Sequence, residues 1–565
     1  METPKQLLRN ILTKYAEGEA FDVLIPPNPK LGDHATNLAF IWAKKENKNP
    51  KEVGDRLVEK LSKDSDIKKY FHKIEVAGNG FVNFFVSDDF ARRELKRISR
   101  DKKFGYNNYR KGQKIMVEFT DPNPFKLFHI GHLMSNAIGE SISRLYEATG
   151  AKVTRVTYQG DVGLHVAKAV WGIKKESLNI STFKNLKDKI KYLGEAYTLG
   201  ARSYEENPEA KTEIEEINKK IYDRSDEEIN KIYDAGKKLS LEYFEEIYKK
   251  LRTKFEHNFF ESEFGPKGIE IIKQHPEIFE ESEGAVVFRG EKYGLHTRVF
   301  INSAGLPVYE AKELGLNKYK FEKYSPDSSV IVTGNEINDY FKVLLKAMEL
   351  TMPEVAKKTK HIGHGMLRFA TGKMSSRTGD VITAEELLEQ LKSKIKQKAA
   401  NKTEEEYDIQ AVAAIKYQIL KQNIGHDIIF DFDKALSITG DAAPYIQYTY
   451  ARLRSIGRKS KKGLFGWLGV DPSKLTKEEE LALIKQLLNF PDVVRDAAEL
   501  HTINTLTTYL YKLASDANYY YETVRILSDD TKRPERNARL LLVETIAQVL
   551  KSGLYLLGIK TLERV

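Results

Sequence analysis

Residues 117–143 read VEFTDPNPFKLFHIGHLMSNAIGESIS, and the rest of the chain is interpreted outward from this stretch. An apolar run from Ile115 to Phe119 predicts a short strand, and the prolines that follow at 122 and 124 forbid both helix and ladder pairing. Small and apolar residues then recur at helical spacing. The stretch therefore predicts a strand, an irregular loop and a helix; the helical positions are Ala137, Ile138, Ile142 and Leu145.

The start of this helix is a candidate anion site, because free backbone N–H groups and the positive end of the helix dipole face the loop. Gly131 lets a flat base or a phosphate approach the backbone. His129 and His132 can donate hydrogen bonds to phosphate oxygens as charge builds. In the alternative interpretation these histidines only cap and pack a helix start. The Asn-Pro break and the upstream Lys126 favour the phosphate site.

The bulk composition is that of a soluble globular protein of about three domains. The chain has 565 residues, of which 41% are apolar and 30% are charged. A net charge of +10 and a pI near 9.0 predict an anionic partner or surface. Charge alone does not separate nucleic acid from membrane.

The absence of cysteine and of long apolar runs excludes several classes of protein. With no cysteine there is no disulfide, thiolate zinc site or cysteine nucleophile. The twelve histidines form no HExxH pattern, so we expect no structural metal, while Mg²⁺ carried by a nucleotide remains open. No apolar run approaches about 18 residues, and the first four residues do not start a signal peptide. We therefore expect a cytoplasmic protein without a membrane segment.

Strand and helix patterns divide the chain into three predicted domains. Residues 109–395 alternate strands and helices, as in an α/β doubly wound parallel sheet. A charged stretch at about 174–250 interrupts them and predicts an inserted helical hairpin. Amphipathic helices alone follow over 396–565, which predicts an all-α domain. Residues 1–108 predict a small α/β unit, with helices at 4–15, 35–45 and 51–61 and strands at 73–77 and 81–86.

Two motifs resemble those of a known family. Asn123, Lys126 and His129-Ile130-Gly131-His132 look like the HIGH signature of class I aminoacyl-tRNA synthetases, in the form used by arginyl-tRNA synthetases. Lys373-Met374-Ser375-Ser376 is similar to their mobile KMSKS loop, which folds over the ATP pyrophosphate. The second lysine of that loop is replaced by Ser376. Arginyl synthetases often lack it and carry a lysine just before the HIGH element, where Lys126 stands.

The resemblance implies a Rossmann-type catalytic domain that uses ATP with Mg²⁺. Catalysis is then positioning plus electrostatics, with no side-chain nucleophile. A basic flexible loop without function is the alternative for residues 372–379. The implied catalytic residues are Lys126, His129, His132 and Lys373, and the implied ATP-binding residues are His129, Gly131, His132, Lys373, Met374, Ser375 and Ser376.

The resemblance also implies a pocket for the arginine side chain. Tyr309 and Glu313 are four residues apart and share one helical face, and a carboxylate and a phenol suit a planar guanidinium. Glu261 matches the family's acidic residue, and Asn123 completes the implied arginine-binding set. A solvated helix with a salt bridge to Lys312 is the alternative.

Several positions depart from the family pattern. Glu313 stands where an aspartate is usual, and Ile337 stands where a glutamine binds the amino acid, so Glu336 or Asn338 would have to substitute. The loop after a predicted strand at 152–158 resembles a GDWG element but has Val162 and His165 in place of tryptophan and glutamine. A second His-Ile-Gly-His at 361–364 has no helix behind it and predicts a strand instead.

Two regions resemble the tRNA-binding parts of arginyl synthetases. In the first unit, Phe81 and Asn83 match positions that touch a D-loop base. Near the end of the chain, aromatics interleaved with arginines match the anticodon-binding domain; these are Tyr445, Tyr448, Arg452, Arg458 and Tyr521. A half-buried strand and an ordinary helix with buried tyrosines are the alternatives.

The sequence as a whole predicts an arginine–tRNA ligase acting on L-arginine, ATP and tRNA(Arg), and we expect a monomer. The resemblance covers essentially the whole chain, in order. Two alternatives stay open. One is another class I synthetase, for glutamate or cysteine, although a glutamate enzyme would want a basic pocket where Glu261 and Glu313 stand. The other is a tRNA-binding paralogue with a decayed site, which the departures at Val162, His165, Ile337 and Ser376 would suit.

Overall fold

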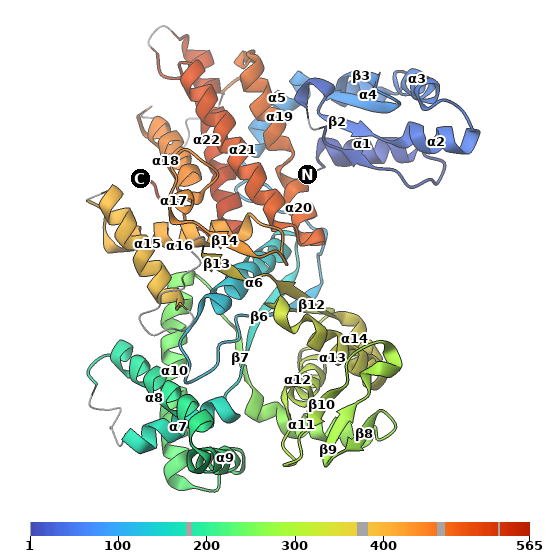
Figure 1. Ribbon diagram of the computed structural model, residues 1–565. Helices are drawn as coiled ribbons and strands as arrows, with labels where there is room; N and C mark the ends of the chain where they lie inside the picture. Colours follow the sequence, from blue (N-terminus) through green and yellow to red (C-terminus); the bar gives the residue numbers. More distant parts are fainter. Residues whose placement is uncertain are drawn as a thin grey trace. The chain divides into compact units, whose positions relative to one another are not determined.

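The structure, a computed structural model, describes residues 2–26, 28–176, 183–369, 382–399, 401–459, 469–528 and 531–564. The chain forms two compact units. One contains Met1–Tyr109, Ser437–Leu556 and Lys560–Val565, and the other contains Arg110–Leu436 with Leu557–Ile559 (Figure 1). No helix of the described residues is long and apolar enough to cross a membrane.

A five-stranded sheet of order β12-β11-β5-β6-β7 forms the centre of the second unit, and every neighbouring pair is parallel. The chain starts in the middle at β5, moves outward to β7, and returns to β11 on the other side of β5. The strand order therefore reverses between β5 and β11, and ligands of doubly wound sheets bind beyond the carboxyl ends at such a point. The strands are β5 Lys114–Phe119, β6 Lys152–Gln159, β7 His257–Phe260, β11 Ser328–Gly334 and β12 Thr359–His364. The predicted fold class is confirmed.

Helices connect and cover these strands. Helix α6, Ile130–Ala148, packs so closely on β5 that a Cβ at Gly139 would lie 2.2 Å from the Phe119 ring. Helices α11 and α12 bury one face of the sheet, where Phe264 of α11 and Leu316 of α12 pack on Met116, Tyr158 and Phe259. The other helices of this unit are α7 Leu164–Glu176, α8 Leu186–Glu206, α9 Pro208–Asp223, α10 Glu227–Leu251, α11 Glu261–Gln274, α12 Tyr309–Tyr324, α13 Asn338–Thr351, α14 Pro353–Lys358, α15 Ala384–Lys398, α16 Glu404–Leu420 and α17 Phe432–Ala435.

The insertion at 174–250 is not a hairpin. It contains the three helices α8, α9 and α10, which pack on one another and on α7 in the crossover from β6 to β7 (Figure 1). The breaks have local causes. Asn207 caps α9, which then starts with Pro208, and Asp226 caps α10 after Arg224 adopts a left-handed conformation.

Two small sheets complete this unit. Strands β8 Phe279–Ser282, β9 Ala285–Phe288 and β10 Arg298–Ile301 form an antiparallel sheet of order β10-β9-β8. Strands β13 Leu367–Phe369 and β14 Ile428–Phe430 pair in parallel. The expectation that strands end near residue 400 is therefore wrong at β14, and residues up to Leu436 belong to the same unit as the large sheet.

The other unit combines the two ends of the chain. Its antiparallel sheet has the order β1-β2-β4-β3. The predicted helix at 35–45 begins later, at Leu38, because Ala35 pairs with Asn83 between β2 and β4. Helices α18, α21 and α22 pack together. The elements are α1 Pro4–Thr13, β1 Val23–Leu24, β2 His34–Thr36, α2 Leu38–Glu46, α3 Pro50–Leu61, α4 Ser65–Tyr70, β3 Phe71–Ala77, β4 Phe81–Val86, α5 Asp88–Ile98, α18 Ala443–Lys459, α19 Glu478–Leu488, α20 Phe490–Leu500, α21 Ile503–Thr523 and α22 Arg533–Leu556.

Candidate active site

The two histidines of the first His-Ile-Gly-His element cap helix α6. His129 is the N-cap, and its Nδ1 accepts a hydrogen bond from the Gly131 N–H at 3.1 Å. The His129 N–H donates to Nδ1 of His132 at 3.3 Å, and the two rings stack with centroids 3.5 Å apart. Because both Nδ1 atoms accept, the neutral rings carry their protons on Nε2 and can donate from there. The capping role and a phosphate-donor role are therefore compatible.

The environment keeps both imidazoles neutral. Burial and the nearby Lys126 lower the pKa of His129 to about 4. Burial, His129 and Lys126 hold the pKa of His132 well below its ordinary value. The Lys126 ammonium itself lies 5.0 Å from the centre of the Tyr197 ring, which α8 provides. Two neutral Nε2–H donors next to a cation suit an anionic ligand, because they can donate hydrogen bonds to its oxygens as negative charge builds there.

The loop between β5 and α6 has an unusual backbone. Thr120, Asp121 and Phe125 have positive φ angles of 84°, 43° and 67°, which side-chain-bearing residues rarely adopt. Surrounding contacts hold it in place. Asp121 accepts a hydrogen bond from the Tyr158 N–H at 2.7 Å, and the Phe125 N–H donates to the Ser240 hydroxyl at 2.9 Å. Such conformations persist at functional sites when the surroundings overdetermine them.

The loop after β6 is anchored by Asp161, which is fully buried. It accepts hydrogen bonds from the Tyr233 hydroxyl at 2.9 Å, the Lys237 ammonium at 2.7 Å and the Ser262 hydroxyl at 2.7 Å. Burial opposes ionisation, but Lys237 and these hydrogen bonds hold the pKa of Asp161 below its ordinary value. His165, which departs from the family pattern, has its Nε2 2.8 Å from the Gly160 carbonyl oxygen and so positions the same loop.

Asn123 and Glu261 meet at Gly160. The Gly160 N–H donates to Oδ1 of Asn123 at 3.2 Å. A Cβ at Gly160 would lie 2.5 Å from that oxygen and 3.0 Å from Oε1 of Glu261, so only glycine allows this approach. The structure thus brings together two of the four predicted arginine-binding residues at the carboxyl end of β6.

Glu261 already has a cationic partner. Its Oε2 lies 2.6 Å from the Lys312 ammonium, and both side chains are buried. Although burial opposes it, Glu261 holds the pKa of Lys312 above its ordinary value. The Lys312 salt bridge of the alternative interpretation therefore exists, but it is buried rather than solvated.

Glu313 is the predicted carboxylate without a cationic partner. It is 1% exposed, accepts a hydrogen bond from Asn317 at 3.0 Å and forms no ion pair with any residue that the structure describes. Burial, followed by the nearby Glu118, raises the pKa of Glu313 well above its ordinary value. A guanidinium would supply the missing charge and paired hydrogen bonds.

Tyrosines surround Glu313. Tyr309 packs between Tyr158 and Tyr340, with ring centroids 6.4 Å and 5.1 Å away. Burial, followed by the Glu313 carboxylate, raises the pKa of Tyr309 and Tyr340 well above the ordinary value. The buried hydroxyls of Tyr158 and Tyr340 have no hydrogen-bond partner among the residues that the structure describes. Such buried polar groups favour a polar ligand beside them.

Sequence reasoning missed some of these residues. Glu118 and Tyr158 lie near the carboxyl ends of β5 and β6, and Glu118 pairs with the buried Lys320 at 2.5 Å. Polar residues at the ends of apolar strands were the available signal. At the position of the missing family glutamine, Ile337 packs on a hydrophobic cluster that includes Tyr340, and Glu336 is exposed. Tyr340 is close enough to Glu313 for burial and that carboxylate together to raise the pKa of the tyrosine.

The second His-Ile-Gly-His element forms β12, which confirms the predicted strand. The His361 ring stacks on Phe341 with centroids 3.8 Å apart, and its Nε2 lies 2.7 Å from the Thr333 hydroxyl. Its side chains therefore bind neighbouring elements and form no helix start.

The predicted residues Lys373, Met374, Ser375 and Ser376 lie outside the described residues. No group of three or more His, Cys, Asp or Glu side chains within the described ranges could hold a metal ion.

The predicted RNA-contact residues differ in exposure. Phe81 is 40% exposed and packs edge-on against Phe40, whereas Asn83 is 3% exposed, so its amide is not presented at the surface. On the C-terminal helices, Tyr448 and Tyr521 are exposed, and the Arg452 guanidinium lies 3.9 Å from the Tyr521 ring centre.

Two further C-terminal residues already have partners. Tyr445 packs against Tyr511, with ring centroids 5.6 Å apart. Arg458 donates to the backbone oxygen of Glu563 at 3.0 Å.

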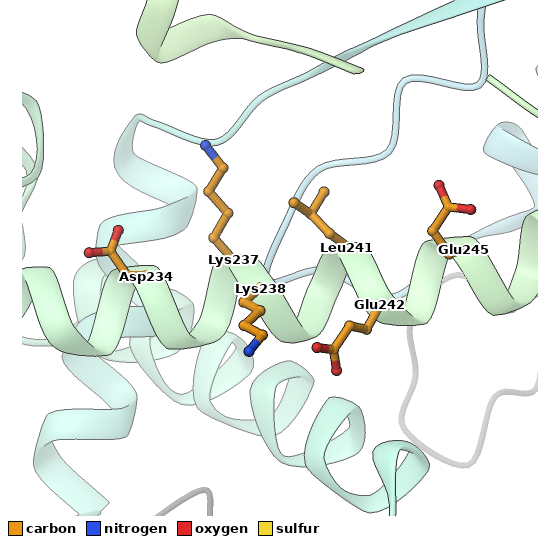
Figure 2. Close-up of a pocket in the computed structure, with 6 residues that line it drawn as sticks. All are labelled: Asp234, Lys237, Lys238, Leu241, Glu242 and Glu245. Carbon is orange, nitrogen blue, oxygen red and sulfur yellow. The ribbon is translucent and has the colours of Figure 1, made fainter. Parts of the chain in front are cut away.

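Two hollows lie beside the insertion. One of about 330 Å³ is lined by residues that include Tyr222, Tyr233 and Lys237. Another of about 380 Å³ runs along α10, where Figure 2 shows Lys237 projecting on the opposite side from Lys238 and Glu242. The second hollow is lined by both signs of charge and does not single out a ligand class.

The doubly wound sheet and the histidine pair at the start of α6 define a class I aminoacyl-tRNA synthetase. The family model described as "tRNA synthetases class I (R), catalytic domain" matches residues 95–432. The arginyl tRNA synthetase N terminal domain matches residues 2–86, and the DALR anticodon binding domain matches residues 446–565. With these matches covering most of its length, the chain belongs to the arginyl-tRNA synthetase family.

Known proteins resemble the chain over its whole length. It is 32% identical to the arginine–tRNA ligase of Fusobacterium nucleatum, with 100% of each chain covered, and 32% identical to that of Clostridium kluyveri, with 96% and 95% covered. The arginyl-tRNA synthetase structure from Thermus thermophilus is similar with a TM-score of 0.82, 23% identity and 99% of each chain covered. That from Plasmodium falciparum has a TM-score of 0.78, 22% identity and 99% and 98% covered. At this identity the structures support the fold alone.

Proposed function

We propose that this chain attaches L-arginine to the 3′-terminal adenosine of tRNA(Arg) at the expense of ATP. The observation that carries the proposal is Glu313, a buried carboxylate without a cationic partner among the described residues, set among three tyrosines. A glutamate or cysteine substrate would leave this carboxylate uncompensated, whereas the arginine guanidinium neutralises it.

In the first step, a carboxylate oxygen of arginine attacks the α-phosphorus of ATP. The bond from that phosphorus to the bridging oxygen breaks, and pyrophosphate leaves with the electron pair. Mg²⁺ enters with ATP as part of the nucleotide substrate. The Nε2–H groups of His129 and His132 and the Lys126 ammonium stabilise the charge that builds on the phosphate oxygens.

In the second step, the 2′-hydroxyl of the terminal adenosine attacks the acyl carbon of arginyl-adenylate. The ester to tRNA forms, AMP leaves with the phosphate oxygen, and the hydroxyl proton passes to a phosphate oxygen. No side chain becomes covalently modified, so catalysis depends on holding the reactants in line.

Recognition of arginine divides between the pocket's two ends. Glu313, Tyr309 and the hydroxyls of Tyr158 and Tyr340 receive the guanidinium. Asn123 and Glu261, which converge at Gly160, form the other end of the arginine pocket. Residues 373–376 contribute phosphate contacts in this proposal by their resemblance to the family loop.

We assign the contacts with tRNA to predicted residues whose side chains are exposed. Phe81 offers a ring for a D-loop base, and Tyr448, Tyr521 and Arg452 offer stacking and cationic surfaces for the anticodon loop. Tyr445 supports that surface from its packed position, and the exposed Arg458 adds a second cation to it. The protein acts as a monomer in the cytoplasm.

Arginine-dependent ATP–pyrophosphate exchange, measured with and without tRNA(Arg), tests the proposal. We expect exchange only with arginine and only when tRNA is present, as is general in the family; exchange at full rate without tRNA would count against it. His129→Ala should abolish exchange and leave tRNA affinity nearly unchanged. Charging of another amino acid would indicate a different synthetase, and tRNA binding without any charging would indicate a decayed paralogue.

A further inference from the structure

The three inserted helices each bring a tyrosine to a charged residue of the site. From α8, the Tyr197 ring lies 5.0 Å from the Lys126 ammonium. From α9, the Tyr222 ring lies 5.6 Å from the Lys312 ammonium. From α10, the Tyr233 hydroxyl donates to Asp161 at 2.9 Å. These charges belong to three different segments of the catalytic unit.

The same helices also lie against both neighbours of Lys126. A Cβ at Gly194 in α8 would be 3.4 Å from the Leu127 side chain. In α10, the Ser240 hydroxyl accepts from the Phe125 N–H at 2.9 Å, and Gly236 lies so close that a Cβ there would be 2.1 Å from the Phe125 ring. Lys126 is thus enclosed by inserted helices through both neighbours and through its own side chain.

Resting on the function proposed above, we propose that the insertion positions the two cations of the site separately, Tyr197 holding Lys126 on the nucleotide side and Tyr222 holding Lys312 on the arginine side. Each ammonium lies within the distance at which a ring face attracts a cation. Lys126 must reach phosphate, and Lys312 must stay on Glu261 so that Glu313 alone presents a free carboxylate to the guanidinium. Tyr197 and Tyr222 are positioning residues and touch no substrate.

Loss of each contact should raise the KM for a different substrate. A cation–ring contact of about 1 kcal/mol corresponds to roughly a fivefold change. Tyr197→Leu should raise the KM for ATP about three- to tenfold and leave the KM for arginine unchanged. Tyr222→Leu should raise the KM for arginine by a similar factor and leave the KM for ATP unchanged. Tyr197→Phe keeps the ring face and should stay near wild type, which also guards against loss of folding. Tyr222→Phe keeps its ring face but loses the hydroxyl contact with Lys312, so its KM for arginine should lie between those of wild type and Tyr222→Leu.

Tyr204→Leu is the matched control, because Tyr204 also lies on α8 and its ring lies 4.1 Å from the Lys168 ammonium, a cation without a role in the site. It should change neither KM. Adding Tyr197→Leu to Lys126→Met should cause no further rise in the KM for ATP.

The inference is overturned if the leucine variants raise both KM values together, as general loosening would, or if they change neither while Lys126→Met raises the KM for ATP. If Lys126→Met changed neither the turnover nor the KM for ATP, the role proposed for Lys126 would be removed, and with it the part assigned to Tyr197.

Discussion

The ammonium of Lys312 lies 2.6 Å from a carboxylate oxygen of Glu261, and both side chains are buried. Removing one partner leaves the other as an uncompensated charge, which typically costs about 3–5 kcal/mol. We expect Lys312→Met to lower the free energy of unfolding by about that amount in urea titrations. Glu261→Gln combined with Lys312→Met should recover most of the loss. Equal stability of the single and double variants would contradict the pairing.

Glu313 should make arginine binding depend on pH. Burial raises its pKa, and only the ionised carboxylate can pair with the guanidinium. The affinity for arginine should therefore rise as pH increases through that pKa. Glu313→Gln should raise the KM for arginine roughly 10- to 150-fold, the equivalent of a charge-assisted hydrogen bond, and flatten the pH profile. Steady-state charging from pH 6 to 9 measures both effects.

The same carboxyl should weaken the fold when it is ionised. A pKa above the unfolded value means that the folded state binds more protons, so its contribution to stability is present at low pH and is lost as pH rises. Glu313→Gln should therefore unfold at a higher temperature than wild type at pH 8, and the difference should shrink at pH 5. A variant less stable than wild type at pH 8 would refute this.

Lys416 should make the stability of the fold rise with pH. Its ammonium is buried, lies 2.6 Å from the Leu251 carbonyl oxygen, and has its pKa lowered by burial and Arg144 to about 7 from 10.5. Between those values the unfolded chain binds more protons, so stability should rise with pH from about 7 to 10.5. Lys416→Met should lose this slope in urea midpoints measured from pH 7 to 9. Lys187→Met, at an exposed site on α8, should keep it.

Tyr521 should contribute to tRNA binding and not to the formation of arginyl-adenylate. Its exposed ring carries the Arg452 guanidinium at 3.9 Å and offers a stacking surface. Tyr521→Ala should weaken tRNA(Arg) binding by about 1–3 kcal/mol, roughly 5- to 150-fold, as loss of one base stack does. The turnover at saturating tRNA should be unchanged. Filter binding and charging at several tRNA concentrations separate the two parameters.

Local patterns predicted the elements that carry their own signals. The strand at 81–86 agrees with β4, and the strand at 115–119 differs from β5 by one residue. The predicted hairpin at 174–250 was wrong because the caps at Asn207 and Asp226 were not recognised as helix starts within a charged stretch. Ala35 was assigned to a helix because its pairing with Asn83 is not visible in the local sequence.

Contacts between distant segments account for the rest of the site. Glu118 pairs with Lys320, and Glu261 with Lys312, across long separations in the chain. Neither pairing has a spacing that a local pattern could reveal. The resemblance supplied Asn123, Glu261, Tyr309 and Glu313, but only the structure shows that Glu261 is neutralised and that Glu313 is not.

The loop between β5 and α6, with its three residues at positive φ, implies an order of events during synthesis. Thr120, Asp121 and Phe125 cannot hold their left-handed backbone alone, and Ser240 supplies one of the hydrogen bonds that fix it. That serine leaves the ribosome more than one hundred residues after the loop it restrains. A nascent chain interrupted before α10 should therefore have its first strand and helix but lack a finished nucleotide site.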